Sequence, residues 1–361
     1  MDLSTISPAL LLASLMVAAT SILIAGIGEL VVERSGVLNL GVEGMMITGA
    51  ICGFIIAVET GSPALGFVAA ALGGAALSLL FALLTQIALA NQVASGLALT
   101  LFGLGLSALM GQKYVGVKPP QTPELDLPFL SDIPFLGTVL FRHDAMVYIG
   151  LLIVVGVWAV LKYTRAGLVL RAVGENHDAA HALGYKVVRI RVLAIMFGGA
   201  CAGLGGAYIS LVRVPQWTEG MTAGAGWIAL ALVVFASWKP WRVLLGAYLF
   251  GGVSVLQLNL QAAGALFPLG TIGWILGGLA VLHFAYCVWR GKLSLASVLV
   301  DIVLLLAGVA AYAYWNGLLV PFKVEYLAMS PYLITILVLV IMSADRSRAP
   351  ASLGRNFHAS G

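Results

Sequence analysis

The chain has 361 residues, of which 61% are hydrophobic and 9% charged, with a formal net charge of +4 and a mean hydropathy of +1.04. Lipid cannot hydrogen-bond to free backbone groups, so repeated apolar runs of about 18 residues or more must span a membrane as helices, which excludes a soluble fold. The runs are continuous, which also excludes the alternating pattern of an outer-membrane barrel. The sequence predicts an all-α, polytopic helical bundle.

Hydropathy predicts about eleven spans in chain order. They cover residues 8–28, 37–58, 64–89, 93–111, 145–162, 190–212, 225–237, 241–260, 268–288, 294–315 and 330–343. The segments 29–44 and 225–237 are short or polar enough to be broken or re-entrant helices. Asp2 is the only charged residue before the first apolar run. The run therefore lacks the basic start of a signal peptide, and we expect it to be a retained span.

The Lys and Arg residues predict the orientation of the bundle. They gather at 162–191, 239–242 and 290–292 and in the tail 344–361, which all fall on one side if every span crosses, and basic loops favour the cytoplasm. The Pro-rich stretch 112–144 then lies outside, where it would meet a delivery protein or serve as a passive cap. We expect residues 1–361 to form a single transmembrane domain with a cytoplasmic loop at 163–190.

The cytoplasmic loop contains the pattern of one short helix within 175–184. Asn176 suits the N-cap, Asp178 lies in the first turn, where the helix dipole favours an anion, and Gly184 suits the left-handed residue that ends a helix. A helix this short is marginal in water unless it is docked, which favours a partner-binding element over a solvated connector. His177 and His181 are four residues apart, but no third ligand is evident, so no metal site is predicted.

A second polar segment, residues 29–46, lies between two apolar spans. Acidic groups there are costly, about 2.5–3.5 kcal/mol for an aspartate at a helix centre, so they should face protein, water or one another. We predict that Asn39 and Glu43, which share a face if the segment is helical, border a solute pathway together with Ser95 and Thr100. For Glu43, the capping of a neighbouring broken helix is an equally open alternative. No intramembrane arginine cluster is present in the sequence, which favours an uncharged polar solute.

The sequence offers no pattern for covalent chemistry. The three cysteines stand singly in apolar segments, and no G-x-x-x-x-G-K-[ST] motif occurs that would bind ATP. No nucleophile pairs with a base in the sequence pattern. We therefore predict no catalytic residues and no metal, and expect no nucleic-acid polymer as a partner.

Four motifs in combination resemble a known family. ERSGVLNLGVEGMM at 33–46, SGLAL at 95–99, RAVGEN at 171–176 with ALG at 182–184, and MTAG at 221–224 are similar to the ABC-importer permeases for nucleosides and simple sugars, within the branched-chain amino acid and ribose permease superfamily. The resemblance runs over about 8–261 and resumes near 322–341. It implies a type II-like inner-membrane permease of about 10–11 transmembrane helices, here with an apparent two-span insertion at 265–320.

The resemblance also implies the partners and the contact residues. A cytoplasmic ABC ATPase would carry ATP and Mg²⁺, a second permease would complete a heterodimer, and an extracytoplasmic lipoprotein would deliver a nucleoside. The chain itself would bind no cofactor. Residues 175–184 match the family's coupling helix. The residues that would couple to the ATPase are Gly174, Glu175, Asn176, Asp178, Ala182, Leu183 and Gly184.

Two other functions stay open at this stage. A simple-sugar importer would have the same architecture and differ only in its cargo. A proton- or sodium-coupled carrier would use Glu43 or Asp301 as a titratable site and need no ATPase.

Overall fold

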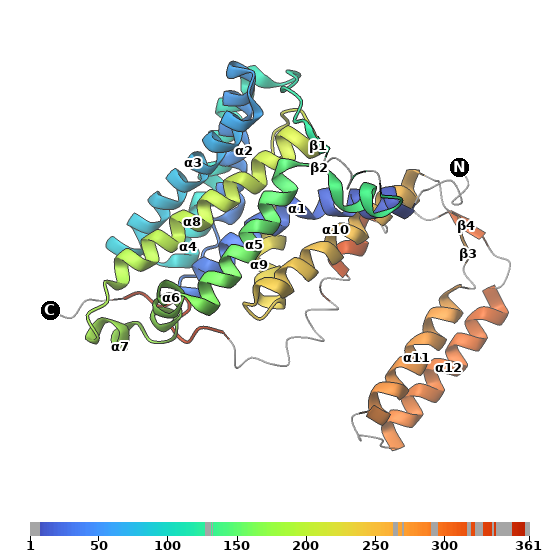
Figure 1. The fold of residues 1–361 in the computed structure, drawn as a ribbon. Helices are drawn as coiled ribbons and strands as arrows, with labels where there is room; N and C mark the ends of the chain where they lie inside the picture. Colours follow the sequence, from blue (N-terminus) through green and yellow to red (C-terminus); the bar gives the residue numbers. More distant parts are fainter. Residues whose placement is uncertain are drawn as a thin grey trace. The chain divides into compact units, whose positions relative to one another are not determined.

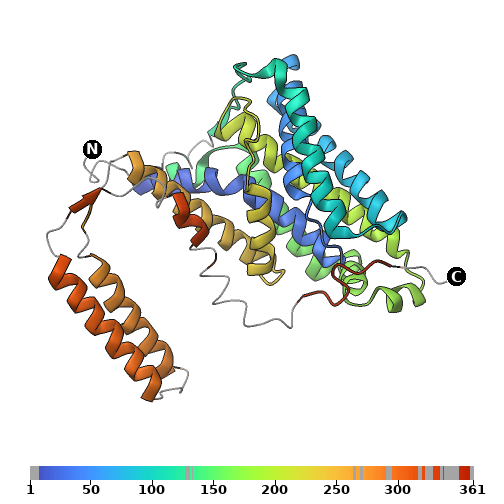
Figure 2. The same ribbon diagram turned by 180° about the vertical axis from the view of Figure 1, so that it is seen from behind.

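The computed structural model describes residues 8–126, 131, 133–262, 266–268, 271–289, 295–315, 319–321, 328–333, 336 and 349–357. They are mainly helical, as Figures 1 and 2 show. The chain divides into two compact units. The larger comprises Ile6–Val255 and Pro331–Gly361, and the smaller comprises Met1–Thr5 and Leu256–Ser330.

The larger unit contains most of the helices. In chain order they are α1 (Pro8–Arg34), α2 (Val42–Thr60), α3 (Pro63–Ala82), α4 (Gln92–Gly111), α5 (Ala145–Tyr163), α6 (Arg165–Glu175), α7 (His177–Ala182), α8 (Val187–Tyr208), α9 (Ala225–Phe235) and α10 (Pro240–Ala262), the last of which ends beyond the unit boundary. Short π- or 3-10-helical turns are η2 (Leu83–Ile87), η3 (Gln112–Tyr114), η4 (Gly137–Phe141) and η5 (Ile209–Arg213). Strand β1 (Glu124–Asp126) pairs antiparallel with β2 (Arg142–Asp144).

Helix α8 lies at the centre of the larger unit, where α1, α2 and α3 pack against it. Glycines make this approach possible. A Cβ at Gly203 of α8 would overlap the backbone of Ala70 in α3, and a Cβ at Gly49 of α2 would overlap the backbone of Gly203. Because lipid gives no hydrophobic drive between helices, such close contact is a main source of stability.

Eight helices among the described residues are long and apolar enough to cross a membrane, and two shorter apolar helices are Ala225–Phe235 and Gly273–Val288. They coincide with the first ten predicted spans. The eleventh, 330–343, lies largely outside the described residues. The polytopic all-α fold is confirmed.

The polar segment between the first two spans differs in detail from the prediction. Helix α1 continues to Arg34 rather than ending at 28. The Asn39 side chain accepts a hydrogen bond from the Gly41 N–H at 3.0 Å, which forms a turn, and α2 begins only at Val42. The premise that Asn39 and Glu43 share a helical face is therefore wrong, because Asn39 precedes the helix.

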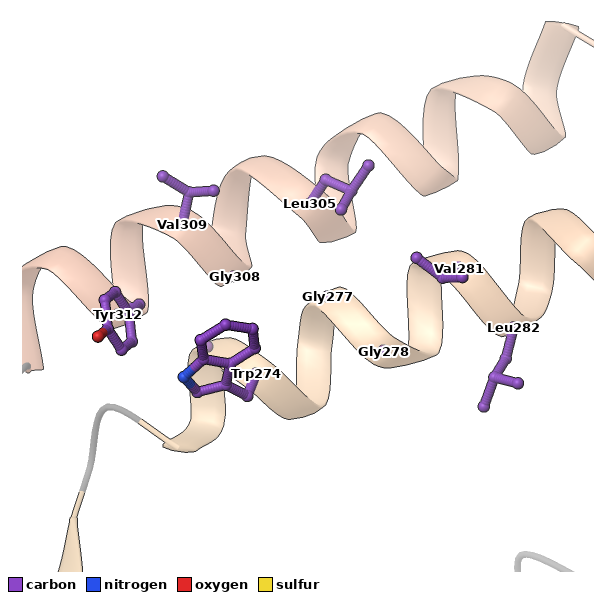
Figure 3. Close-up of a pocket in the computed structure, with 10 residues that line it drawn as sticks. Trp274, Gly277, Gly278, Val281, Leu282, Leu305, Gly308, Val309 and Tyr312 are labelled. Carbon is purple, nitrogen blue, oxygen red and sulfur yellow. The ribbon is translucent and has the colours of Figure 1, made fainter.

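The smaller unit includes residues 265–320, where the sequence predicted an insertion. It contains α11 (Thr271–Trp289), α12 (Leu295–Trp315) and the antiparallel strands β3 (Leu266–Pro268) and β4 (Leu319–Pro321). Helices α11 and α12 lie side by side (Figure 3). A pocket of about 710 Å³ between them is apolar and is lined in part by Trp274 and Tyr312. His283 Nδ1 lies 2.7 Å from Asp301 Oδ1, so the carboxylate of Asp301 has a basic partner.

Candidate coupling site and solute pathway

The cytoplasmic loop predicted at 163–190 contains two helices rather than one. Helix α6 begins after Thr164, whose hydroxyl accepts a hydrogen bond from the Gly167 N–H at 3.1 Å. Helix α7 follows directly. Asn176 Oδ1 accepts from the Ala179 N–H at 2.9 Å, and Gly184 has a φ of +87°. The predicted N-cap and left-handed end of the short helix are confirmed, whereas α6 was missed.

Helix α7 and the turn that follows it expose charged, small and apolar side chains. Leu183 is 77% exposed, and Asp178 and Ala182 are also exposed, while His177 and Ala180 are buried. Glu175, Asn176 and Gly184 are exposed as well. Six of the seven residues predicted to contact an ATPase thus lie at the surface of this region.

Gly174 is the buried exception, and it joins α6 to α1. A Cβ at this position would overlap the carbonyl oxygen of Arg34, the last residue of α1. Only glycine permits such a contact between the two backbones. The helix that precedes α7 is therefore in direct contact with the segment that leads into the second span.

Arg191, near the start of α8, is fully buried and joins four segments. Its Nε donates to Ser35 O at 3.2 Å, and its Nη1 donates to Arg355 O at 3.0 Å and lies 3.5 Å from Gln86 Oε1. Its Nη2 donates to His177 Nδ1 at 3.2 Å. This guanidinium ties α7 to the turn after α1.

The end of α1 also fixes the turn that follows α9. The Glu33 carboxylate accepts a hydrogen bond from Trp238 Nε1, and Arg34 Nε and Nη2 donate to Trp238 O at 3.2 and 3.0 Å. Ser237 and Trp238 both have positive φ, 48° and 54°, which is a costly conformation for residues other than glycine. Residues 33–34 hold this turn in place.

Glu43 caps α9, which was one of the two alternatives left open. Its Oε1 accepts from Thr222 Oγ1 at 2.7 Å and its Oε2 accepts from the Gly226 N–H at 2.8 Å. The carboxylate therefore lies at the positive end of the α9 dipole. Gly226 is required here, because a Cβ would overlap the backbone of Glu43. Glu43 thus connects α2 to the shorter helix α9.

The other predicted pathway residues surround the start of α2. Asn39 is fully buried and donates from Nδ2 to Glu29 Oε2 at 3.0 Å. Thr100 of α4 donates to Leu40 O at 3.1 Å, and Ser95 lies on the same helix. All four predicted residues are less than 10% exposed in this conformation.

Sequence reasoning missed Arg191 and Trp238 as site residues. Arg191 was counted only as part of a basic loop, and Trp238 was assigned no role. An arginine at the start of an apolar span could have been recognised from the sequence as a candidate site residue, because its charge needs polar partners if the side chain is buried. The partners themselves are far away in the chain and could not be read from spacing.

The α7 histidine His177 has a charged side chain near each of its two ring nitrogens. His177 Nδ1 faces Arg191, and its Nε2 lies 3.6 Å from Asp178 Oδ1. No group of three or more His, Cys, Asp or Glu side chains that could hold a metal ion occurs in the part of the chain that the structure describes.

Comparison with known proteins places this architecture in a family. The family profile described as "Branched-chain amino acid transport system / permease component" matches residues 11–267. The chain is 44% identical over 267 residues to TsgC13 of Haloferax volcanii, provisionally named a glucose ABC transporter permease protein, with 73% of this chain and 81% of that protein covered. No solved structure matches.

Two further relatives carry nucleoside names. The guanosine ABC transporter permease protein NupQ of Bacillus subtilis is 34% identical over 283 residues, covering 74% of this chain and 86% of NupQ. The nucleoside ABC transporter permease protein NupC of Lactococcus lactis is 30% identical over 271 residues, covering 72% and 84%. Haloferax volcanii and Bacillus subtilis each have a second, less similar relative, at 28% and 24% identity, also named for glucose and guanosine permeases.

The chain belongs to the branched-chain amino acid transport system permease family. It is a multi-pass membrane permease, a transport subunit whose relatives are named as ABC transporter permeases for nucleosides and sugars.

Proposed function

We propose that the chain is the permease subunit of an ATP-binding-cassette importer that carries an uncharged polar solute, a nucleoside, across the plasma membrane. ATP and Mg²⁺ bind to a separate cytoplasmic ATPase, and this chain performs no covalent chemistry. The exposed helix α7 is the coupling helix that contacts the ATPase, through Glu175, Asp178 and Leu183 above all.

The observation that carries the proposal is the continuous path from α7 to the centre of the larger unit. Arg191 ties His177 of α7 to Ser35, and Gly174 contacts Arg34 directly. The turn that follows Ser35 leads to Asn39 and then to Glu43 at the start of α2. We infer that a displacement of α7 by the ATPase is transmitted to the predicted pathway through these contacts.

In this mechanism Glu43 and Asn39 change their exposure during the transport cycle. Both are buried here, and Glu43 holds the N-terminus of α9. Displacement of the start of α2 relative to α4 and α9 opens the polar groups at 39–43 to a solute. The Pro-rich segment 112–144 receives the loaded lipoprotein on the outer side.

The second permease subunit is a different chain of the same family. Support comes from the two organisms in which relatives occur as a more similar and a less similar member under the same substrate name. The loop 163–190 lies in the cytoplasm in this proposal, because loops rich in Lys and Arg favour that side of the membrane.

A simple sugar is the second candidate cargo. The specific observation in its favour is the 44% identity to the relative named for glucose, which exceeds the 34% identity to the relative named for guanosine. Both cargoes are uncharged and polar, and both suit a sequence that has no arginine cluster within its apolar spans.

Uptake by the reconstituted importer tests the function. The chain, its ATPase and the second permease are placed in liposomes with the binding lipoprotein outside, and labelled guanosine and labelled glucose are offered separately. The proposal predicts guanosine uptake that needs internal ATP. Uptake of glucose alone would select the second candidate, and uptake by this chain alone on an ion gradient without ATP would overturn the importer assignment.

A further inference from the structure

The C-terminal segment 349–357, named here the C-terminal strap, lies against the coupling region. In Figures 1 and 2 it is the red-brown trace that runs close to α6 and α7 near the end of the chain. The sequence predicted only that the tail 344–361 is cytoplasmic. The contacts of the strap show that it is an integral part of the same structural region.

Ser352 closes the junction between α6 and α7. Its N–H donates to Gly174 O at 2.9 Å, and its hydroxyl donates to Glu175 O at 3.3 Å and accepts from the His177 N–H at 3.4 Å. These are carbonyl groups at the end of α6 and an amide at the start of α7, which the helices themselves leave unpaired. One serine thus pairs two carbonyl groups at the end of α6 and one amide at the start of α7.

The next residues of the strap reach the turn after α1. The Gly354 N–H donates to Gly36 O at 3.2 Å, and Arg355 O accepts the hydrogen bond from Arg191 Nη1. Gly354 has a φ of +75°, so the backbone direction required here favours glycine. The strap therefore touches both ends of the path from α7 to the start of α2.

Asn356 connects the strap to the segment before α4. Its Nδ2 donates to Leu89 O at 2.7 Å, and its Oδ1 accepts from Gln92 Nε2 at 3.1 Å. Gln92 Oε1 in turn accepts from the Leu38 N–H at 2.8 Å, next to Asn39. This chain of hydrogen bonds reaches the predicted solute pathway.

Phe357 supplies the apolar support of α7. Its ring lies 5.5 Å from the ring of His177 and 5.1 Å from that of His181, measured between centroids. Phe357 is 6% exposed and forms a small core with Val173, Ala180 and Val187 that is separate from the main cores. A helix of six residues is unstable alone, so this core contributes, together with Arg191 and Ser352, to holding α7 in position.

We propose that the C-terminal strap is a working part of the coupling machinery, which holds α7 rigidly to the turn after α1 so that force from the ATPase reaches the start of α2. This inference rests on the proposed function and assigns a positioning role to Ser352, Asn356 and Phe357. Without the strap, the ATPase displaces α7 alone and the turn after α1 does not follow. ATP hydrolysis then no longer drives transport of the solute.

The first test measures α7 directly and needs no transport. Hydrogen exchange of the 174–185 backbone is compared between the full-length wild-type chain, Phe357→Ala, Ser352→Ala and a chain that ends at Ala349, each in lipid nanodiscs. We expect exchange about tenfold faster in α7 for Phe357→Ala and for the shortened chain, with the main helices unchanged. Unchanged exchange in α7 would overturn the proposal.

Arg355→Ala is the matched control within the strap. The Arg355 side chain is exposed, and the contact with Arg191 uses its backbone carbonyl, which the substitution keeps. Phe357→Leu is the conservative variant, which retains an apolar side chain over α7. Both should stay close to the wild type, whereas an Arg355→Ala effect equal to that of Phe357→Ala would contradict the assigned contacts.

The second test measures coupling in the reconstituted importer as solute moved per ATP hydrolysed. We expect Phe357→Ala to lower this ratio about tenfold while ATP hydrolysis continues. An unchanged ratio would overturn the proposal. A higher ratio would also overturn it, because the strap would then inhibit coupling. If the wild-type complex shows no ATP-driven uptake at all, the proposed function fails, while hydrogen exchange still decides whether the strap holds α7.

Discussion

Replacement of Arg191 by lysine should destabilise the coupling region strongly although it conserves the charge. The arginine is fully buried and donates to acceptors on three separate segments at 3.0–3.2 Å, namely Ser35 O, Arg355 O and His177 Nδ1. A lysine has a single nitrogen at its tip and cannot span these three directions, so about two acceptors lose their donor.

The size of the effect follows from these contacts. A hydrogen bond to a charged group contributes about 1.5–3 kcal/mol, so the loss of two costs at least about 3 kcal/mol. At about 2–4 °C per kcal/mol for a unit of this size, the melting temperature should fall by roughly 6–12 °C. The bond to Gln86, at 3.5 Å, is long and adds little.

Thermal unfolding of the purified protein in detergent, followed by tryptophan fluorescence at one scan rate, measures this change. Arg189→Lys is the matched control, because Arg189 lies two residues earlier on the same helix with an exposed side chain. The control should unfold within about 1–2 °C of the wild type. An Arg191→Lys protein that unfolds together with the control would refute the role of Arg191 as a buried connection between segments.

Three further substitutions test the coupling surface and the pathway. Glu43→Ala removes both acceptors at the start of α9 and should cost about 2–4 kcal/mol in thermal unfolding, whereas a shift no larger than that of a surface substitution would contradict the capping role. Leu183→Asp should leave membrane insertion and stability intact but reduce uptake per ATP about tenfold in liposomes, since the side chain is exposed; normal coupling would remove Leu183 from the ATPase contact. Asn39→Leu removes the donor to Glu29 and should change solute flux in the same assay, and unchanged flux together with unchanged stability would remove Asn39 from the pathway.

Local signals in the sequence predicted the elements well where one segment determines its own structure. The short helix α7 is one case, because Asn176 and Gly184 set its ends through bonds and dihedral angles within a few residues. Helix α6 was missed although Thr164 offers the same type of cap. Leu170 and Val173 are three residues apart, which is the spacing of one helix face, but the basic residues of this segment favoured a loop.

The end of α1 is an element boundary that hydropathy predicted too early in the chain. Acidic groups at 29 and 33 suggested that the span ended at 28, but the helix continues to Arg34. The two carboxylates find partners in Asn39 and in Trp238, and the second of these lies about two hundred residues away. The hydrogen bonds from these partners offset part of the cost of burying the two carboxylates, although Glu29 Oε1 accepts no hydrogen bond.

The amino-acid sequence alone determined the class of the protein, since its long apolar runs allow only membrane-spanning helices and its motifs at 33–46, 95–99 and 171–184 point to one permease family. The tertiary structure alone decided what the polar residues do. Glu43 caps α9, Arg191 joins α7 to Ser35, and the C-terminal strap supports α7. The physical reason is that hydropathy depends on each segment separately, whereas a buried polar group takes whichever partner the packing of distant helices brings within hydrogen-bond reach.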